Sequence, residues 1–130
     1  MRVLICEDQD AIRRMIEALI GSSGHQVVGV STGAKAFELA SSEHFDVLLL
    51  DLMLPGALDG FEVCARLRAL EKTRDMPIFV ISAMDDPESK RRALGAGATA
   101  FYSKPFRPLE LLKNIGAVAG EARSAEKKSR

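Results

Sequence analysis

The sequence has little cysteine, no tryptophan, no excess of either charge and no long hydrophobic run. Its two cysteines, Cys6 in an apolar run and Cys64 on a helical pattern, are typical of small buried hydrophobes in a reducing compartment, so we expect no disulfide framework. The 18 basic and 18 acidic residues cancel. Because the broad positive field that draws proteins onto nucleic acid is missing, we expect no direct nucleic-acid binding.

The first hydrophobic run is too short for a signal-peptide core or a membrane span. It extends from Val3 to Cys6 and is interrupted at once by Glu7 and Asp8. We therefore expect a cytoplasmic protein without membrane contact.

The length of 130 residues and the hydrophobic content of 47% suit one domain that folds without metal or disulfide crosslinks. We assign this domain to residues 1–120. Residues 121–130 are polar and form either a C-terminal tail or the start of a linker.

Apolar runs alternate with helical patterns along the whole domain. Unbroken runs at 2–6, 27–30, 45–50 and 78–81, with a weaker one at 99–103, indicate strands that are covered on both faces. Helical spacing occurs at 12–20, 36–40 and 61–70, then from the acidic cap before Pro87 to about Gly95–Gly97, and from Pro108 onward. The alternation predicts an α/β fold, a doubly wound five-stranded parallel sheet of order 2-1-3-4-5 flanked by five helices.

Polar residues follow four of these runs and should meet at the carboxyl edge of the sheet. They are Glu7 and Asp8, Asp51, Ser82, and Lys104 with Pro105. If three carboxylates converge, each pair about 4 Å apart repels by about 4 kcal/mol at an effective dielectric of 20, which one lysine does not offset. The oxygen donors suit Mg²⁺, and a carboxylate beside such a cation can attack phosphorus.

We take Asp51 as that nucleophile, with Ser82 and Lys104 placed to hold phosphoryl oxygens. Simpler interpretations stay open at this point. Glu7 and Asp8 could cap the first helix, although Asp10 is better placed to do so, and Asp51 could start a turn. Pro105 also makes a cis peptide bond at Lys104 possible.

Four motifs in this order and spacing resemble the CheY-like receiver domain of two-component response regulators over residues 1 to about 120. They are VLICEDQD, DVLLLDLMLPGALDGFEVC, PIFVISA and FYSKPF. The resemblance implies a flavodoxin-like fold and an Asp51 that accepts a phosphoryl group from the phosphohistidine of a sensor histidine kinase or phosphotransfer protein. It also implies that Asp8 binds Mg²⁺ directly, that Glu7 acts through water, and that the Met53 carbonyl completes the protein ligands.

The resemblance further implies a switch made of Ser82, Phe101, Lys104 and Pro105, which couples Asp51 to the face of the fourth helix, fifth strand and fifth helix. Four features depart from the commonest pattern of the family. Glu7 replaces an aspartate, the loop from Pro55 to Gly60 is one residue longer, and Ser82 lacks the methyl group of threonine. Phe101 has no hydroxyl, which favours a switch driven by packing.

The leading hypothesis is a phosphoacceptor signalling switch. It is not an enzyme, although it would carry intrinsic phosphotransfer and autodephosphorylation chemistry. A downstream protein or an output domain would receive the signal, from a monomer or a weak phosphorylation-dependent dimer.

The alternative hypothesis is a receiver-like interaction module that is never phosphorylated. A haloacid-dehalogenase-like phosphatase needs a second aspartate where Met53 stands. A flavodoxin-like FMN carrier is disfavoured because the acidic residues from Glu7 to Asp10 would repel its phosphate.

Overall fold

The apolar runs form the strands of one parallel sheet in the computed structural model, which describes residues 1–117. The strands are β1 (Arg2–Cys6), β2 (Gln26–Val30), β3 (Val47–Leu50), β4 (Ile78–Ser82) and β5 (Ala100–Ser103). Their order is β2-β1-β3-β4-β5 and every neighbouring pair is parallel, so the predicted topology is confirmed. The expected tail at 121–130 and the end of the fifth helical pattern at Val118 lie outside the described residues.

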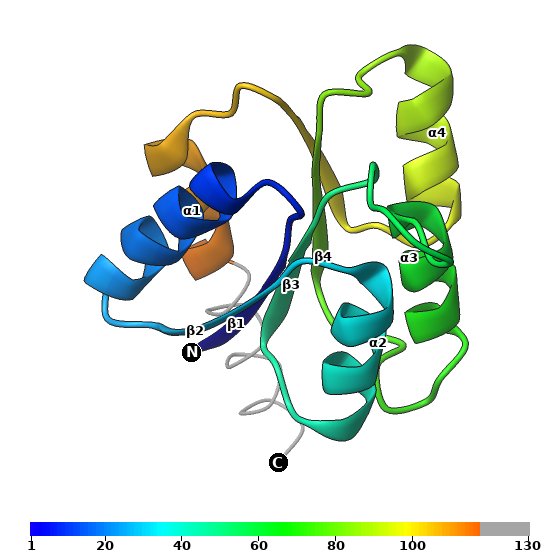
Figure 1. Ribbon diagram of the computed structural model, residues 1–130, viewed down its shortest axis with the longest axis horizontal. Coiled ribbons are helices and arrows are strands. Elements are labelled where there is room, and N and C mark those ends of the chain that lie inside the picture. The colour runs from blue at the N-terminus through cyan, green and yellow to red at the C-terminus, as the bar shows by residue number, and fades with distance from the viewer. Residues whose placement is uncertain (118–130) are drawn as a thin grey trace.

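Helices cover both faces of the sheet (Figure 1). They are α1 (Asp10–Ser22), α2 (Gly33–Ser42), α3 (Gly60–Arg68), α4 (Pro87–Gly95) and a C-terminal helix that occupies 108–117 of the described residues. Buried residues of α1 and the C-terminal helix share one apolar cluster with the sheet, whereas those of α2, α3 and α4 share the other. The result is a three-layer sandwich.

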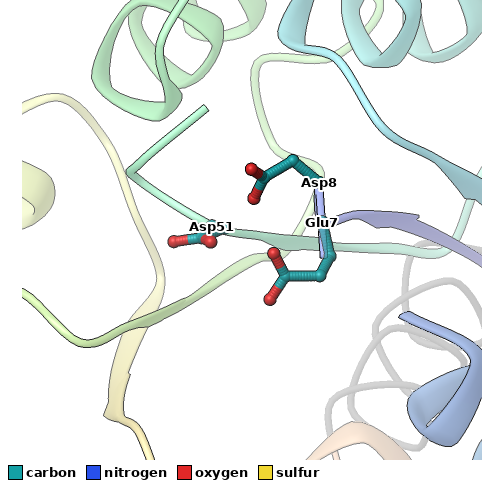
Figure 2. A group of neighbouring side chains, drawn as sticks. All are labelled: Glu7, Asp8 and Asp51. Atoms are coloured by element: carbon teal, nitrogen blue, oxygen red, sulfur yellow. The ribbon is translucent and has the colours of Figure 1, made fainter. Parts of the chain in front are cut away.

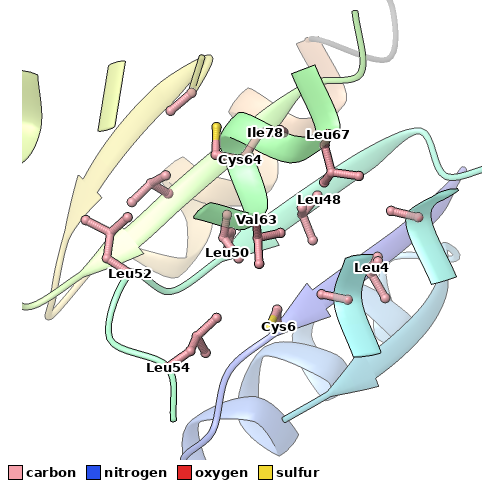
Figure 3. Close-up of a cluster of buried hydrophobic side chains, with 14 of the residues drawn as sticks. Leu4, Cys6, Leu48, Leu50, Leu52, Leu54, Val63, Cys64, Leu67 and Ile78 are labelled. Carbon is pink, nitrogen blue, oxygen red and sulfur yellow. The ribbon is translucent and has the colours of Figure 1, made fainter. Parts of the chain in front are cut away.

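The side chains of each central strand alternate between the two clusters. Val3 and Ile5 point to the side of α1, whereas Leu4 and Cys6 point to the side of α2 and α3. Figure 3 shows the second cluster, in which Leu48 and Leu50 of β3 pack against Val63 and other residues of α3. Because both faces are covered, the central strands are apolar at every position except Arg2 at the start of β1 and Ser82 at the end of β4, which explains the unbroken runs.

The helices α1 to α4 each begin after an N-cap residue, and in all but α1 the side chain of that residue accepts a backbone hydrogen bond. Asp59 and Asp86 accept hydrogen bonds from the third residue that follows them, and Pro87 stands in the first turn of α4 as predicted. The expectation that Asp10 caps α1 is wrong: Gln9 occupies the capping position without a side-chain bond, and Asp10 is the first helical residue. Its carboxylate instead accepts a 2.6 Å hydrogen bond from Arg13.

No helix among residues 1–117 is both long enough and apolar enough to cross a membrane.

Candidate functional site

Glu7 and Asp51 leave the sheet side by side. Cys6 of β1 pairs with Leu50 of β3, and the backbone ladder continues one step further because the Asp51 amide donates to the Cys6 carbonyl at 3.0 Å. The Lys104 amide likewise donates to the Ser82 carbonyl at 3.0 Å. Backbone hydrogen bonds that extend the sheet therefore position Asp51 and Lys104.

Three carboxylates meet at this edge. Glu7, Asp8 and Asp51 each place one carboxylate oxygen within 4.8 Å of the other two. Figure 2 shows the three side chains gathered at this edge. Glu7 is 3% exposed and Asp51 is 6% exposed, whereas Asp8 lies at the surface. Partial desolvation, then a hydrogen bond with Glu7 and the repulsion between the two charges, raise the pKa of Asp8.

Lys104 supplies the positive charge that faces this group. Its Nζ donates to Asp51 Oδ2 at 3.1 Å and also to Glu7 Oε1. Burial by itself would lower the pKa of Lys104, but its hydrogen bonds to Glu7 and Asp51 and the attraction of the two carboxylates outweigh it and raise the pKa. The ammonium therefore stays charged. The peptide bond between Lys104 and Pro105 is cis, the geometry that the sequence made possible.

The donor set fits Mg²⁺. The cluster offers carboxylate oxygens only, and three carboxylates facing one ammonium leave two uncompensated negative charges. Hard divalent cations prefer oxygen ligands, and Mg²⁺ usually keeps several waters and binds about one or two carboxylates. Glu7, Asp8 and Asp51 are the residues that could hold the ion.

A cavity of about 210 Å³ opens above the carboxylates, and Met53 lines it together with Asp8, Gln9, Asp51, Ala83 and Lys104. The Met53 side chain is 56% exposed, and its amide donates to Asp51 Oδ1 at 3.2 Å. The loop after Asp51 returns tightly at Gly60, where a Cβ would lie 2.3 Å from the Asp51 carbonyl oxygen. The longer loop therefore closes on the same edge of the sheet.

Ser82 lies deeper than the other predicted residues. It is fully buried, its Oγ accepts a hydrogen bond from the Met84 amide at 3.1 Å, and Ala83 lines the cavity beside it. Sequence reasoning did not identify Gln9, Ala83 or Arg13 as parts of this region. Arg13 donates to the Glu7 carbonyl at 3.0 Å, a contact that only its position on α1 could have indicated.

Phe101 and Tyr102 point to opposite faces of the sheet. Phe101 is partly buried beside the cluster of α3 and α4, and the Lys90 ammonium lies 5.8 Å from its ring centroid. The Tyr102 hydroxyl accepts a 2.8 Å hydrogen bond from Asn114 on the C-terminal helix, and its ring contacts Phe79. Of the two aromatics, Phe101 is the one that faces α4.

Comparison with known proteins extends over nearly the whole chain. Residues 3–116 match the family model described as the response regulator receiver domain. A probable transcriptional regulator, ycf27 of Guillardia theta, is 38% identical over 117 residues, which cover 90% of this chain and 44% of the relative. The chain spans about half the length of the curated relatives it matches.

Solved structures resemble the fold closely. The receiver domain of Francisella response regulator 1452 has a TM-score of 0.86 at 26% identity, covering 93% of this chain and 98% of that one. The receiver domain of the sensor histidine kinase PA1611 from Pseudomonas aeruginosa has a TM-score of 0.85 at 31% identity, covering 92% and 97%. That structure has a magnesium ion coordinated in its active-site cleft.

Proposed function

The chain belongs to the response regulator receiver domain family, and from this membership we propose that it is a phosphoacceptor switch whose Asp51 receives the phosphoryl group. The donor is the phosphohistidine of a sensor histidine kinase or phosphotransfer protein. An Asp51 carboxylate oxygen attacks phosphorus, the nitrogen–phosphorus bond breaks, and the histidine ring leaves with the bonding electrons.

One observation carries the proposal. Asp51 is 6% exposed, lines the 210 Å³ cavity, and accepts a 3.1 Å hydrogen bond from Lys104 through its carboxylate. A buried carboxylate beside a fixed ammonium and two further carboxylates is poorly explained as a turn-starting aspartate. It suits a group on which additional negative charge must be held.

Mg²⁺ supplies charge neutralisation for the transferring group when it is bound. Asp8, Asp51 and the Met53 carbonyl are its expected direct ligands, with Glu7 acting through water. Lys104, which already donates to Asp51, would attract the phosphoryl oxygens, and the Ser82 hydroxyl would donate a hydrogen bond to one of them while its oxygen accepts from the Met84 amide.

The response is expected at the surface formed by α4, β5 and the C-terminal helix. Ser82 ends β4 just before α4, and Phe101 of β5 packs against the cluster that includes α4, so these are the two residues through which the proposal carries the change from Asp51 to this surface. A downstream protein or an output domain reads the change. The chain is a regulatory domain in this proposal rather than an enzyme, and its two buried cysteines suit the cytoplasm.

Intact-mass spectrometry tests the proposal. Incubation with acetyl phosphate and Mg²⁺ should add one phosphoryl group to wild-type protein, and EDTA or the Asp51→Asn substitution should abolish the addition. Asp75→Asn, at an exposed acidic residue away from the cavity, is the matched control and should be phosphorylated normally. Folded wild-type protein that gains no mass would leave the unphosphorylated interaction module as the better description.

A further inference from the structure

The side chain of Glu7 contacts the switch lysine as well as the carboxylate cluster. Its Oε1 accepts a hydrogen bond from Lys104 Nζ, and its Oε2 accepts one from the Gln9 amide at 3.3 Å. Both oxygens are therefore engaged, and the side chain is only 4% exposed. This arrangement distinguishes Glu7 from Asp8, whose carboxylate lies at the surface.

The reach of Glu7 depends on its second methylene. An aspartate at this position would end about one carbon–carbon bond, roughly 1.5 Å, short of the place that the glutamate carboxylate occupies. A hydrogen bond stretched by that amount is lost. The glutamate at this position therefore decides whether Lys104 has one carboxylate partner or two.

The Lys104 ammonium has more hydrogen-bond acceptors around it in the phosphorylated state than it can bind equally well. The ammonium lies between Glu7 and Asp51, and the Lys104 side chain, which is 17% exposed, lines the cavity beside Asp51. Phosphoryl oxygens on Asp51 would carry more negative charge than the carboxylate and would compete for the same ammonium. A hydrogen bond between Lys104 and Glu7 therefore stabilises the unphosphorylated state relative to the phosphorylated state.

We propose that Glu7 is a positioning residue that holds Lys104 in its resting place and competes with the phosphoryl group for it. This inference rests on the proposed function of Asp51. It assigns to Glu7 a role in addition to its expected water-mediated contact with Mg²⁺: Glu7 sets how readily the lysine transfers to the phosphoryl oxygens and hence how fully the switch responds.

Two substitutions separate the reach of Glu7 from its charge. Glu7→Asp keeps the charge and shortens the arm, whereas Glu7→Gln keeps the length and removes the charge. Glu62→Asp, at an exposed position of α3, is the matched control. Circular dichroism establishes that each variant is folded.

The first measurement is hydrogen exchange of the Lys104 ammonium by NMR in metal-free protein, with Lys104→Arg identifying the signal. Glu7→Asp should speed the exchange about tenfold, the factor that corresponds to losing one charge-assisted hydrogen bond. Glu7→Gln should have a smaller effect because its amide oxygen still reaches the ammonium. Unchanged exchange in both variants would overturn the inference without any reference to phosphorylation.

The second measurement is binding of beryllofluoride, a phosphoryl mimic, at saturating Mg²⁺ for each protein. Glu7→Asp should bind beryllofluoride about tenfold more tightly than wild type, because Lys104 no longer has to break a hydrogen bond with residue 7 before it binds the mimic. If wild type binds beryllofluoride and Glu7→Asp binds it equally tightly or more weakly, the inference is overturned and the proposed function stands. A wild type that takes up neither beryllofluoride nor phosphoryl groups overturns the inference together with the proposed function.

Discussion

The two cysteine thiols are buried in the cluster between the sheet and α3. Burial, with a smaller contribution from Asp51, raises the pKa of Cys6 to about 12, and burial also raises the pKa of Cys64. Both thiols should therefore stay protonated and unreactive at pH 8. We expect iodoacetamide to add no label to native protein and two labels in urea, as read by intact mass. A label on the native protein would show that the cluster opens readily.

Asp46 joins the starts of β1 and β3 through a 2.7 Å hydrogen bond from the Arg2 amide. Burial alone would raise the pKa of Asp46, but this bond and the neighbouring His44 outweigh it and lower the pKa. A lowered pKa stabilises the fold above the unfolded value near pH 4, and the stabilisation is lost as the pH falls through the folded value.

Asp46→Asn should therefore reduce stability at pH 7 by at most about 1 kcal/mol, since the carboxylate is partly exposed and screened by solvent. The deficit should narrow below about pH 4, where wild type loses the same contribution. Urea unfolding at a series of pH values measures this, and a deficit that stays constant down to pH 2 would contradict it.

The residues of the candidate site were predictable because each follows an apolar run. Glu7, Asp8, Asp51 and Lys104 stand at strand ends, and the parallel topology brings those ends to one edge. Their partners were not predictable in the same way. The hydrogen bond from Lys104 to Glu7 depends on the length of both side chains, and a pattern of polar and apolar residues does not record it. The wrong cap at Asp10 arose because the same pattern does not fix the first residue of α1.

At the scale of elements, Arg68 fastens the end of α3 to two connecting segments. Its guanidinium donates to the carbonyls of Gly97, Thr73 and Arg74 at 2.8, 3.0 and 3.1 Å. Gly97 has a φ of +111°, and a Cβ there would lie 2.4 Å from Arg68 Cγ. The turn between α4 and β5 is therefore shaped around this side chain.

Arg68→Met should destabilise the protein by about 2 kcal/mol, because two half-buried carbonyls, those of Gly97 and Thr73, and the exposed Arg74 carbonyl lose a charged donor. Amide exchange should accelerate most over 94–99, the segment that the guanidinium holds. Arg66→Met, at an exposed position of the same helix, is the control and should change stability by less than about 0.5 kcal/mol. Equal effects of the two substitutions would refute this role of Arg68.

The type and order of the elements were predictable, whereas their ends were less so. The helical pattern over 61–70 predicted that Leu70 belongs to α3, but the helix ends at Arg68 and Leu70 is 36% exposed. Similarly, β3 begins at Val47, although the apolar run begins at Phe45, which is buried before the strand starts. At Phe45 burial extends beyond the regular hydrogen bonds of the strand, whereas at Leu70 the apolar spacing of the sequence extends beyond both the helix and the buried core.

At the scale of the whole molecule, charge is balanced overall but concentrated locally at the carboxyl edge of the sheet. Mg²⁺ should therefore raise the melting temperature, since a ligand at one hundred times its Kd adds about 2.7 kcal/mol of stability. Asp8→Asn should lose most of this gain, whereas Asp75→Asn should keep it. Differential scanning calorimetry with and without Mg²⁺ measures the gain, and an equal rise in both variants would contradict this assignment.

The backbone ladder that runs one residue past β1 and β3 also determines where the chain can change its length. Successive side chains of a strand alternate between faces, so deleting one residue within β3 would turn Asp51 away from Glu7 and Asp8. An insertion between Met53 and Asp59 would leave that parity untouched. Insertions and deletions should therefore be tolerated in the loop after Asp51 and not within β3.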